Sequence, residues 1–455
     1  MINDKDKARG LVFIFWGTCT MKHFVGLLLL IATFASAIEN NNLINKKDFR
    51  LDRPIGKMTN EEQDLFIIGR SFFAVPWVIA PSATTARDGL GPLFNANTCR
   101  SCHNGNGVGE KYNRHQQISR AMVTKLSRAN HEPIPHYGEQ IAVNGTINTP
   151  FEAIPTLIET PVPVTYPDGT VVTLKKPTYG LKALNYGPLP DDIIIVQRRA
   201  PALIGLGLLT KVSDEEILTY SDPEDKNHDG ISGRPNWLDT NKKQLGRFTA
   251  KASVGSVVEQ TAIAAANDMG LTNPLFPKEL CEPEQISCNK APRGRPDPYG
   301  STLDLTGARL AAITYFVSNT RIPIKQLDAS GEKGKQLFKQ VGCQNCHRAN
   351  MTTYDGITFS PYTDLLLHDM GKGLADGRRE ASADGQEFRT APLWGLSTYE
   401  KTLKSKKPHY LHDARAETLE EAILWHGGEA ENSRRKFMAL PQKQRQAILA
   451  FLNQL

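Results

Sequence analysis

Two short clusters of cysteine and histidine are the residues with the clearest capacity for chemistry. Each has the spacing Cys-x-x-Cys-His, once at residues 99–103 and again at residues 343–347. In this spacing two thiols can form thioether bonds to the vinyl groups of a haem, and the histidine can bind the iron as an axial ligand. The sequence therefore predicts two covalently bound haem c groups, held by Cys99, Cys102, Cys343 and Cys346, with His103 and His347 as iron ligands.

An alternative is that the same cysteines form thiol redox sites or zinc sites. Both of those chemistries use Cys-x-x-Cys pairs. Neither of them requires a histidine directly after the second cysteine, and this chain has one there twice. The repetition favours haem attachment over thiol exchange or zinc.

The motifs lie in a chain of 455 residues, which is long enough for two or three domains with hydrophobic cores. The formal net charge is only +6. A nucleic-acid partner would call for a clustered basic face, which the sequence does not indicate. We therefore expect no nucleic-acid partner.

The amino terminus has the pattern of an export signal. Residues 21–37 combine a short basic start, an apolar run and an Ala-Ser-Ala site, which is typical of a secretory signal peptide. We predict that residues 1–37 are removed, leaving a periplasmic protein with a net charge of +4 and no membrane span. The alternative is a retained membrane anchor, although the apolar run is short for a full span.

Capping patterns and apolar periodicity predict a mainly α fold. Thr59 and Glu62 make a capping box before an apolar helix, and Ser213 with Glu216 starts another. Further helices are expected at residues 257–269 and 303–318. A helix around residues 337–341 precedes the second motif, and a last helix begins near Pro441 and ends the chain.

A helix, a haem motif and a terminal helix are the parts of a cytochrome c domain. We expect two cytochrome c-like haem domains, at residues 38–325 and 326–455. The first would contain a β-containing insertion at about residues 105–196, where Pro, Gly and β-branched residues become frequent. Within it, residues 162–174 predict two strands joined by a Pro-Asp-Gly turn.

Two other features point to a metal and to a disulfide. Asp225, Asn227 and Asp229 alternate before Gly230, as the oxygen ligands of an EF-hand calcium loop do, but Asn236 stands where such a loop has glutamate. We predict a calcium site there, with a solvated turn as the alternative. Cys281 and Cys288 are close in sequence and favour a disulfide in an exported protein, the alternative being two free thiols.

The chain resembles the di-haem oxidoreductase family related to bacterial di-haem cytochrome c peroxidases and to MauG. The resemblance lies in residues 89–103, 199–203, 260–270, 388–395, 410–413 and 418–427, so it extends over most of the mature chain. The middle insertion is not peroxidase-like. The resemblance implies that one haem relays electrons and that the other meets peroxide.

In the family, the sixth ligand of the relay haem follows a Leu-Glu-Glu-Ala helix. The matching residue here is His426, near the end of a helix that Thr418 and Glu421 would cap. The resemblance thus implies that His347 and His426 bind the second iron. The alternatives are a histidine favoured by the helix dipole, or a different sixth ligand chosen from Met370, His368 and His412.

For the first haem, the resemblance implies a distal carboxyl at Asp268, where peroxidases have glutamate. Such a carboxyl can move a proton between the oxygens of peroxide, while the alternative is a polar residue at a helix end. His115 is the nearest downstream candidate for a sixth ligand. Phe248 stands where relatives have a tryptophan between the haems, and the cations expected beside the propionates are Arg198, Arg199 and Lys251.

The function implied is that of an exported, peroxidase-like di-haem oxidoreductase. The second haem would take electrons from a small redox protein, and the first would reduce peroxide or another small oxidant. One alternative is a non-catalytic electron-transfer cytochrome in which both irons have six ligands. Another is a MauG-like oxidase that acts on a side chain of another protein.

Overall fold

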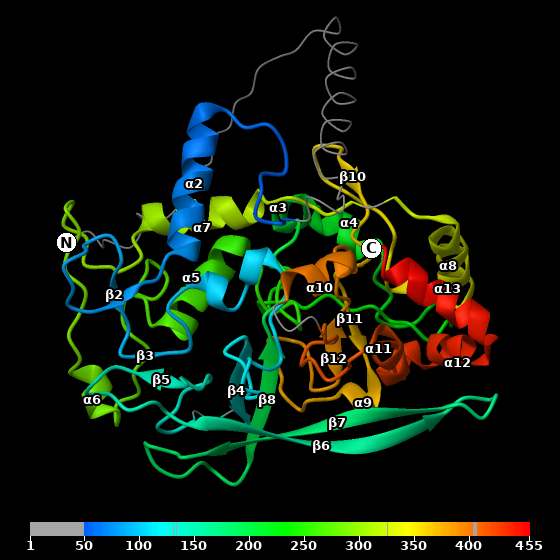
Figure 1. Cartoon of the computed structure of the whole chain (residues 1–455), viewed down its shortest axis with the longest axis horizontal. Helices are drawn as coiled ribbons and strands as arrows, with labels where there is room; N and C mark the ends of the chain where they lie inside the picture. Colours follow the sequence, from blue (N-terminus) through cyan, green and yellow to red (C-terminus); the bar gives the residue numbers. More distant parts are fainter. Residues whose placement is uncertain (1–49, 131, 133, 325, 404–406) are drawn as a thin grey trace, which may run out of the picture.

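A computed structural model describes residues 50–130, 132, 134–324, 326–403 and 407–455 (Figure 1). The predicted export signal at residues 1–37 lies outside this range. Among the described residues, each helix is too short or too polar to cross a membrane.

The described residues of the first part of the chain form six α-helices. They are α2 (Asn60–Ala74), α3 (Leu206–Lys211), α4 (Asp214–Leu218), α5 (Val257–Met269), α6 (Ile286–Asn289) and α7 (Gly307–Ser318). The predicted capping box of α2 is confirmed, because Thr59 Oγ1 accepts a bond from Glu62 N while Glu62 accepts one from Thr59 N. The predicted cap of α4 is also present, with Ser213 Oγ accepting from Glu216 N.

The first hydrophobic core forms where α2, α5 and α7 pack together. Phe316 of α7 makes ring contacts with both Phe66 and Phe73 of α2, with centroid distances of 5.0 and 5.2 Å. This core is not confined to the first part of the chain, since Met351, Leu365, Leu366 and Trp394 also belong to it.

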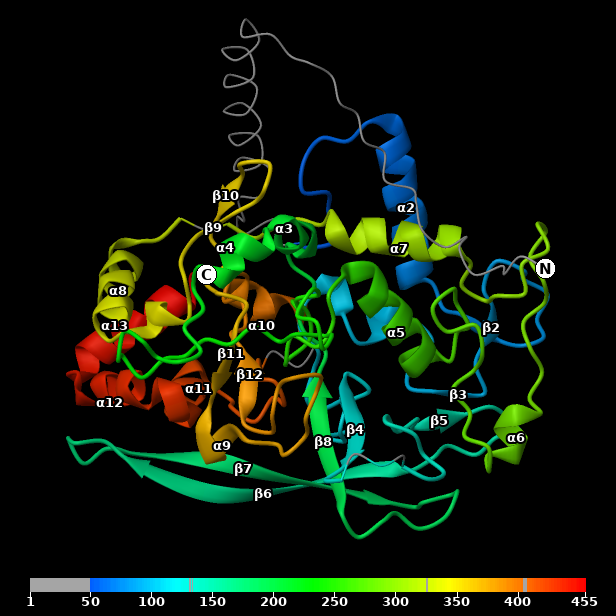
Figure 2. The same cartoon turned by 180° about the vertical axis from the view of Figure 1, so that it is seen from behind.

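The helices of the second part lie on the other side of the molecule (Figure 2). They are α8 (Ala329–Gln340), α9 (Gly371–Leu374), α10 (Tyr399–Thr402), α11 (Leu419–Trp425), α12 (Glu431–Ala439) and α13 (Gln442–Leu452). Pro441 is the residue before α13 rather than part of its first turn. The apolar stripe of α13 packs against α8, with Ile448 and Phe451 fully buried in a second core.

The strands form six two-stranded sheets among the described residues. The short strands are β1 (Val78–Ile79), β2 (Asp88–Leu90), β3 (Leu93–Phe94), β5 (Asn144–Gly145), β9 (Met351–Thr352), β10 (Thr358–Phe359), β11 (Leu367–Asp369) and β12 (Glu387–Arg389). The longer ones are β4 (Met122–Arg128), β6 (Ile154–Thr165), β7 (Val171–Lys182) and β8 (Ile193–Arg199). β6 and β7 form the predicted hairpin, which is longer than expected and pairs in register over twelve residues a strand.

The β6–β7 hairpin runs beneath both parts of the molecule (Figures 1 and 2). At its tip, Tyr166 is buried in the second core and donates a 2.8 Å hydrogen bond to Glu420 of α11. Arg445 of α13 lies 4.1 Å over the Tyr166 ring and bonds Asp168 at 2.9 Å. The hairpin therefore joins the first part of the chain to the second core.

The predicted disulfide is confirmed by the structure. Cys281 and Cys288 are bonded to each other, and the bond closes the segment that contains α6. Cys288 is buried against Leu93 and Ala142, so the bond holds α6 close to the residues that precede the first haem motif.

The prediction of a mainly α fold with two cytochrome c-like haem domains is wrong. Among the described residues, helix accounts for 29% and strand for 18%, and the strands are spread over several small sheets. Strands of two or three residues are too short to produce an alternating pattern, and β3 pairs with β5, which lies about fifty residues away. Helix caps are local signals, and they dominated the prediction for that reason.

Gly69 provides a test of the packing between α2 and α7. A Cβ atom at Gly69 would lie 1.9 Å from the carbonyl oxygen of Ala312, so Gly69→Ala must push the helices apart. We expect a loss of about 1–3 kcal/mol in unfolding free energy, measured by chemical denaturation. Gly56→Ala is the control, because a Cβ there meets no atom within 4 Å. Equal stability of the two variants would contradict the packing described.

Candidate haem sites

The first motif lies in a short turn that is stabilised by its own residues. Thr98 Oγ1 accepts a 2.9 Å bond from Ser101 N and caps η2 (Cys99–Ser101). The ring of His103 donates its Nδ1–H to the carbonyl oxygen of Pro201 at 2.8 Å, since a carbonyl can only accept. Burial lowers the pKa of His103 to about 4, so the ring is neutral and Nε2 carries a lone pair.

The second motif repeats this arrangement. Gly342, with φ of +93°, starts η4 (Cys343–Asn345), where a left-handed backbone suits glycine. His347 donates Nδ1–H to the carbonyl oxygen of Tyr362 at 3.0 Å. Burial, and to a smaller extent the nearby His426, lowers the pKa of His347 to about 4. Both motif histidines are therefore neutral rings with a fixed orientation.

The cysteines of the motifs are not bonded to each other. Burial raises the pKa of Cys99 to about 12 and that of Cys343 to about 12. A thiol with such a pKa holds almost no thiolate at neutral pH, and the thiolate is the form that exchanges with disulfides. The arrangement is therefore unfavourable for thiol redox chemistry.

His426 has the same pattern as the motif histidines. It is the residue directly after α11, with extended backbone (φ −63°, ψ 128°), rather than part of the last turn. Its Nδ1–H donates to the carbonyl oxygen of Ala422 at 2.7 Å, and burial lowers its pKa. Trp425 and His426 line a cavity of about 290 Å³, together with Val162, Val164 and Leu174 of the hairpin.

The other candidates for a sixth ligand have different environments. His368 has both ring nitrogens bonded to carboxylates, those of Asp364 and Glu429. His412 stacks on Phe388 with ring centroids 3.9 Å apart. Met370 packs against the second core, and His115 is exposed and accepts a bond from Arg114 Nε. Of these residues, His426 is the one that matches the motif histidines.

Asp268 lies near the end of α5, beside the first motif. Its carbonyl oxygen accepts bonds from Asn95 N (2.8 Å) and Ala96 N (3.1 Å), which holds the end of α5 on the segment that leads into Cys99. Its carboxylate accepts a 2.7 Å bond from Gln140 Nε2. Burial raises the pKa of Asp268, and the Asp268 charge in turn raises the pKa values of both cysteines of the motif. No pattern in the sequence around Gln140 predicts its hydrogen bond to Asp268.

Two of the three cations predicted beside the propionates have protein partners instead. Lys251 is fully buried, donates to the carbonyl oxygens of Asp384 (2.7 Å) and Glu387 (2.8 Å) and lies 3.4 Å from Asp376. Arg198 pairs with Asp376 and Glu380. Phe248, predicted to lie between the haems, is buried in the first core.

Arg199 and Arg389 are different, because neither guanidinium has a carboxylate within ion-pair distance among the described residues. Arg199 donates to the carbonyl oxygen of His409 and lies 5.7 Å over the Tyr399 ring. Arg389 donates to the carbonyl oxygen of Thr249 at 2.9 Å. Burial lowers the pKa of Arg199, and it lowers that of Arg389 to about 10. Sequence analysis did not identify Arg389.

The side-chain oxygens of the predicted calcium loop accept hydrogen bonds from backbone N–H groups of the same loop. Asp225 accepts bonds from Gly230 N at 3.2 Å, and Asn227 and Asp229 accept from the N–H groups two residues ahead of each. Asn236 is buried, and its side-chain amide donates to the carbonyl oxygens of Lys251 and Glu380, which lie outside this loop. Calcium binding therefore stays a prediction.

The two motifs with their neutral, fixed histidines, and two half-buried arginines without a carboxylate partner among the described residues, fit a protein that holds two haem groups. The family described as "Di-haem oxidoreductase, putative peroxidase" matches residues 157–455, and the chain belongs to this family. The first motif lies before the matched residues.

Two further comparisons complete this picture. The chain matches none of the curated proteins. Its structure is similar to "Kuenenia stuttgartiensis Hydrazine Synthase Pressurized with 20 bar Xenon", with 13% identity over 90% of this chain and 96% of that one. The TM-score is 0.31, and a similarity of this level does not define a shared fold.

Lys251 allows a test of the buried charges at this site. Lys251→Met leaves two carbonyl oxygens without their donor and removes one partner of Asp376, so we expect a loss of about 3–5 kcal/mol in chemical denaturation. Lys226→Met is the matched control, because the ion pair of Lys226 with Glu224 is exposed and its loss should leave stability unchanged. A Lys251 variant as stable as the control would contradict this view.

Proposed function

We propose that the protein is an exported, peroxidase-like oxidoreductase with two covalently attached haems. A small redox protein supplies two electrons to the second haem site, and hydrogen peroxide is reduced at the first. The reaction consumes one peroxide molecule, two electrons and two protons, and it releases two molecules of water. Calcium at residues 225–229 remains part of the proposal.

The observation that carries this proposal is the difference between the two motifs. The second motif has another neutral histidine, His426, close enough to His347 to lower its pKa. The first motif has a carboxyl, Asp268, which lies close enough to Cys99 and Cys102 to raise the pKa values of both thiols. Two histidines favour a six-coordinate iron that only passes electrons, whereas a carboxyl beside an open position favours chemistry on a bound oxidant.

A bound haem would supply the iron that accepts peroxide and the redox capacity that splits its O–O bond. The protein supplies the proton transfer. Asp268 would move a proton from one oxygen atom of the peroxide to the other, so that the departing oxygen leaves as water. Gln140 fixes the carboxylate for this transfer, and the raised pKa of Asp268 brings it closer to neutral pH.

Arg199 and Arg389 are the residues that we assign to the haem propionates. Arg199 is two residues from Pro201, which holds His103. The charge of Asp364, near the Tyr362 carbonyl that holds His347, acts on Arg389. Each motif thus has one half-buried cation without a carboxylate within ion-pair distance among the described residues. A propionate would provide that partner through a charge-assisted hydrogen bond.

The test is electron paramagnetic resonance on the purified holoprotein, oxidised and half-reduced, before and after addition of hydrogen peroxide. A high-spin signal that peroxide consumes would support an open site at the first haem. If both haems stay low-spin and unreactive, the protein is an electron-transfer cytochrome instead.

Asp268→Asn tests the proton transfer directly. The amide cannot take up a proton, so we expect peroxide turnover to fall by about 10²–10⁴-fold while the haem content stays at two. Glu259→Gln is the matched control, because this carboxylate lies in the first turn of the same helix. Turnover of Asp268→Asn at the wild-type rate would exclude Asp268 from catalysis.

Arg389→Leu and Arg199→Leu test the propionate assignment. Loss of a half-buried positive charge destabilises the reduced haem, so we expect each variant to lower one of the two reduction potentials by tens of millivolts in spectroelectrochemical titration. Arg435→Leu removes an exposed arginine and serves as the control. Potentials equal to those of wild type in both variants would contradict the assignment.

A further inference from the structure

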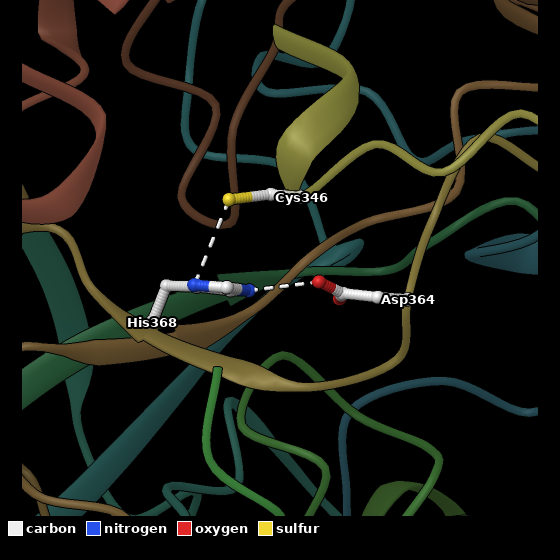
Figure 3. A group of neighbouring side chains, drawn as sticks. All are labelled: Cys346, Asp364 and His368. Carbon is white, nitrogen blue, oxygen red and sulfur yellow. Dashed lines mark hydrogen bonds and ion pairs between the residues drawn. The ribbon is translucent and has the colours of Figure 1, made fainter. Parts of the chain in front are cut away.

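His368 is buried between two carboxylates in the second half of the chain, those of Asp364 and Glu429. Figure 3 draws His368 with Asp364. Its Nε2 is 3.0 Å from Asp364 Oδ2, and its Nδ1 is 2.6 Å from Glu429 Oε2. Carboxylates only accept, so both ring nitrogens donate and the ring is an imidazolium. We call these three residues, Asp364, His368 and Glu429, the His368 cluster.

Each carboxylate of the cluster belongs to a segment that holds one of the proposed ligands of the second iron. Asp364 is two residues after Tyr362, whose carbonyl oxygen fixes His347. Thr363 N also donates to the carbonyl oxygen of Arg348, the residue after His347. On the other side, Glu429 is three residues after His426. His368 therefore connects the segment that orients His347 to the turn that carries His426.

The turn at residues 427–429, directly after His426, lies against backbone atoms of Asp369, the last residue of β11. Glu429 Oε1 accepts a 3.2 Å bond from Asp369 N, directly after His368. A Cβ atom on Gly428 would lie 2.2 Å from the carbonyl oxygen of Asp369, and one on Gly371 would lie 2.7 Å from Gly428 N. This close approach requires glycine at both positions, so the turn has little freedom as long as Glu429 stays bound.

We propose that His368 is a positioning residue that keeps His426 within reach of the second haem iron. This inference rests on the proposed function, because it takes His347 and His426 as the two ligands. Without His368, Glu429 would lose its charged partner and Asp364 would lose its link to the turn. The turn at residues 427–429 would then open, and His426 would leave the iron.

The same place offers another possibility, a small metal site. Ligand atoms of Cys346, Asp364 and His368 all lie within 4.8 Å of one another (Figure 3). However, both nitrogens of His368 are already engaged with carboxylates, and a Cys346 that is bonded to haem has no thiolate to offer. The geometry therefore favours the positioning role.

The experiment compares variants of the full-length holoprotein by electron paramagnetic resonance and by carbon monoxide binding to the reduced form. His426→Ala should convert the second haem from low-spin to high-spin. His368→Ala should raise the high-spin fraction of this haem at least tenfold over wild type and should allow carbon monoxide to bind, with two haems still attached. His136→Ala removes a histidine–glutamate contact outside the cluster and is the control.

Two further variants separate positioning from a general loss of structure. Glu429→Ala removes the bond to His368 together with those that Glu429 accepts from Ser232 and Asp369 N. It should therefore release the turn at least as fully as His368→Ala, and it also answers the question if His368→Ala fails to incorporate haem. Glu429→Gln keeps an acceptor oxygen for Nδ1–H and should restore most of the low-spin signal.

The outcomes are distinguishable. If His426→Ala changes the second haem but His368→Ala and Glu429→Ala leave it low-spin, the positioning role is overturned while the proposed ligands stand. If His426→Ala leaves the haem unchanged, the proposed ligand is wrong and the inference falls with it.

Discussion

A histidine can bind iron only when its ring is neutral and its free nitrogen faces the metal. Three main-chain carbonyls impose this condition here, because those of Pro201, Tyr362 and Ala422 each accept the Nδ1–H of one histidine. Pro201 lies just beyond β8, Tyr362 lies in a loop before β11, and Ala422 lies in α11. The haem sites therefore depend on three separate pieces of backbone arriving at the right positions.

Buried charges bring these pieces together. Arg198 of β8 pairs with Asp376 and Glu380, and Arg378 donates to the carbonyl oxygen of Leu126 in β4 and to Glu139. The Lys251 ammonium lies 4.1 Å from the centre of the Phe388 ring. Phe388 belongs to β12, which pairs with β11. Ions in such a place are costly unless each one is paired, so the network favours one arrangement of β4, β8 and β12 over others.

The sequence was sufficient for features that depend on neighbouring residues. The Cys-x-x-Cys-His motifs, the caps at Thr59 and Ser213 and the Pro-Asp-Gly turn all act within a few positions of themselves. The fold class was wrong because most strands are only two or three residues long and have no pattern of their own, and because β3 and β4 pair with distant segments. Gln140, Arg389 and Glu429 were missed for the same reason, since their partners are far away in sequence.

The long β6–β7 hairpin also governs the order in which the chain can fold. Tyr166 and Leu174 belong to a core whose other members come from residues 337–452. A chain made from its amino terminus therefore carries a paired ribbon with unburied aromatic and aliphatic side chains until the last helices have been synthesised. Contacts between residues so far apart in sequence form slowly, and the intermediates that precede them are prone to aggregate. The carboxyl-terminal helices thus bury a surface of the hairpin that stays exposed until they are made. Successful folding therefore requires synthesis of the whole polypeptide.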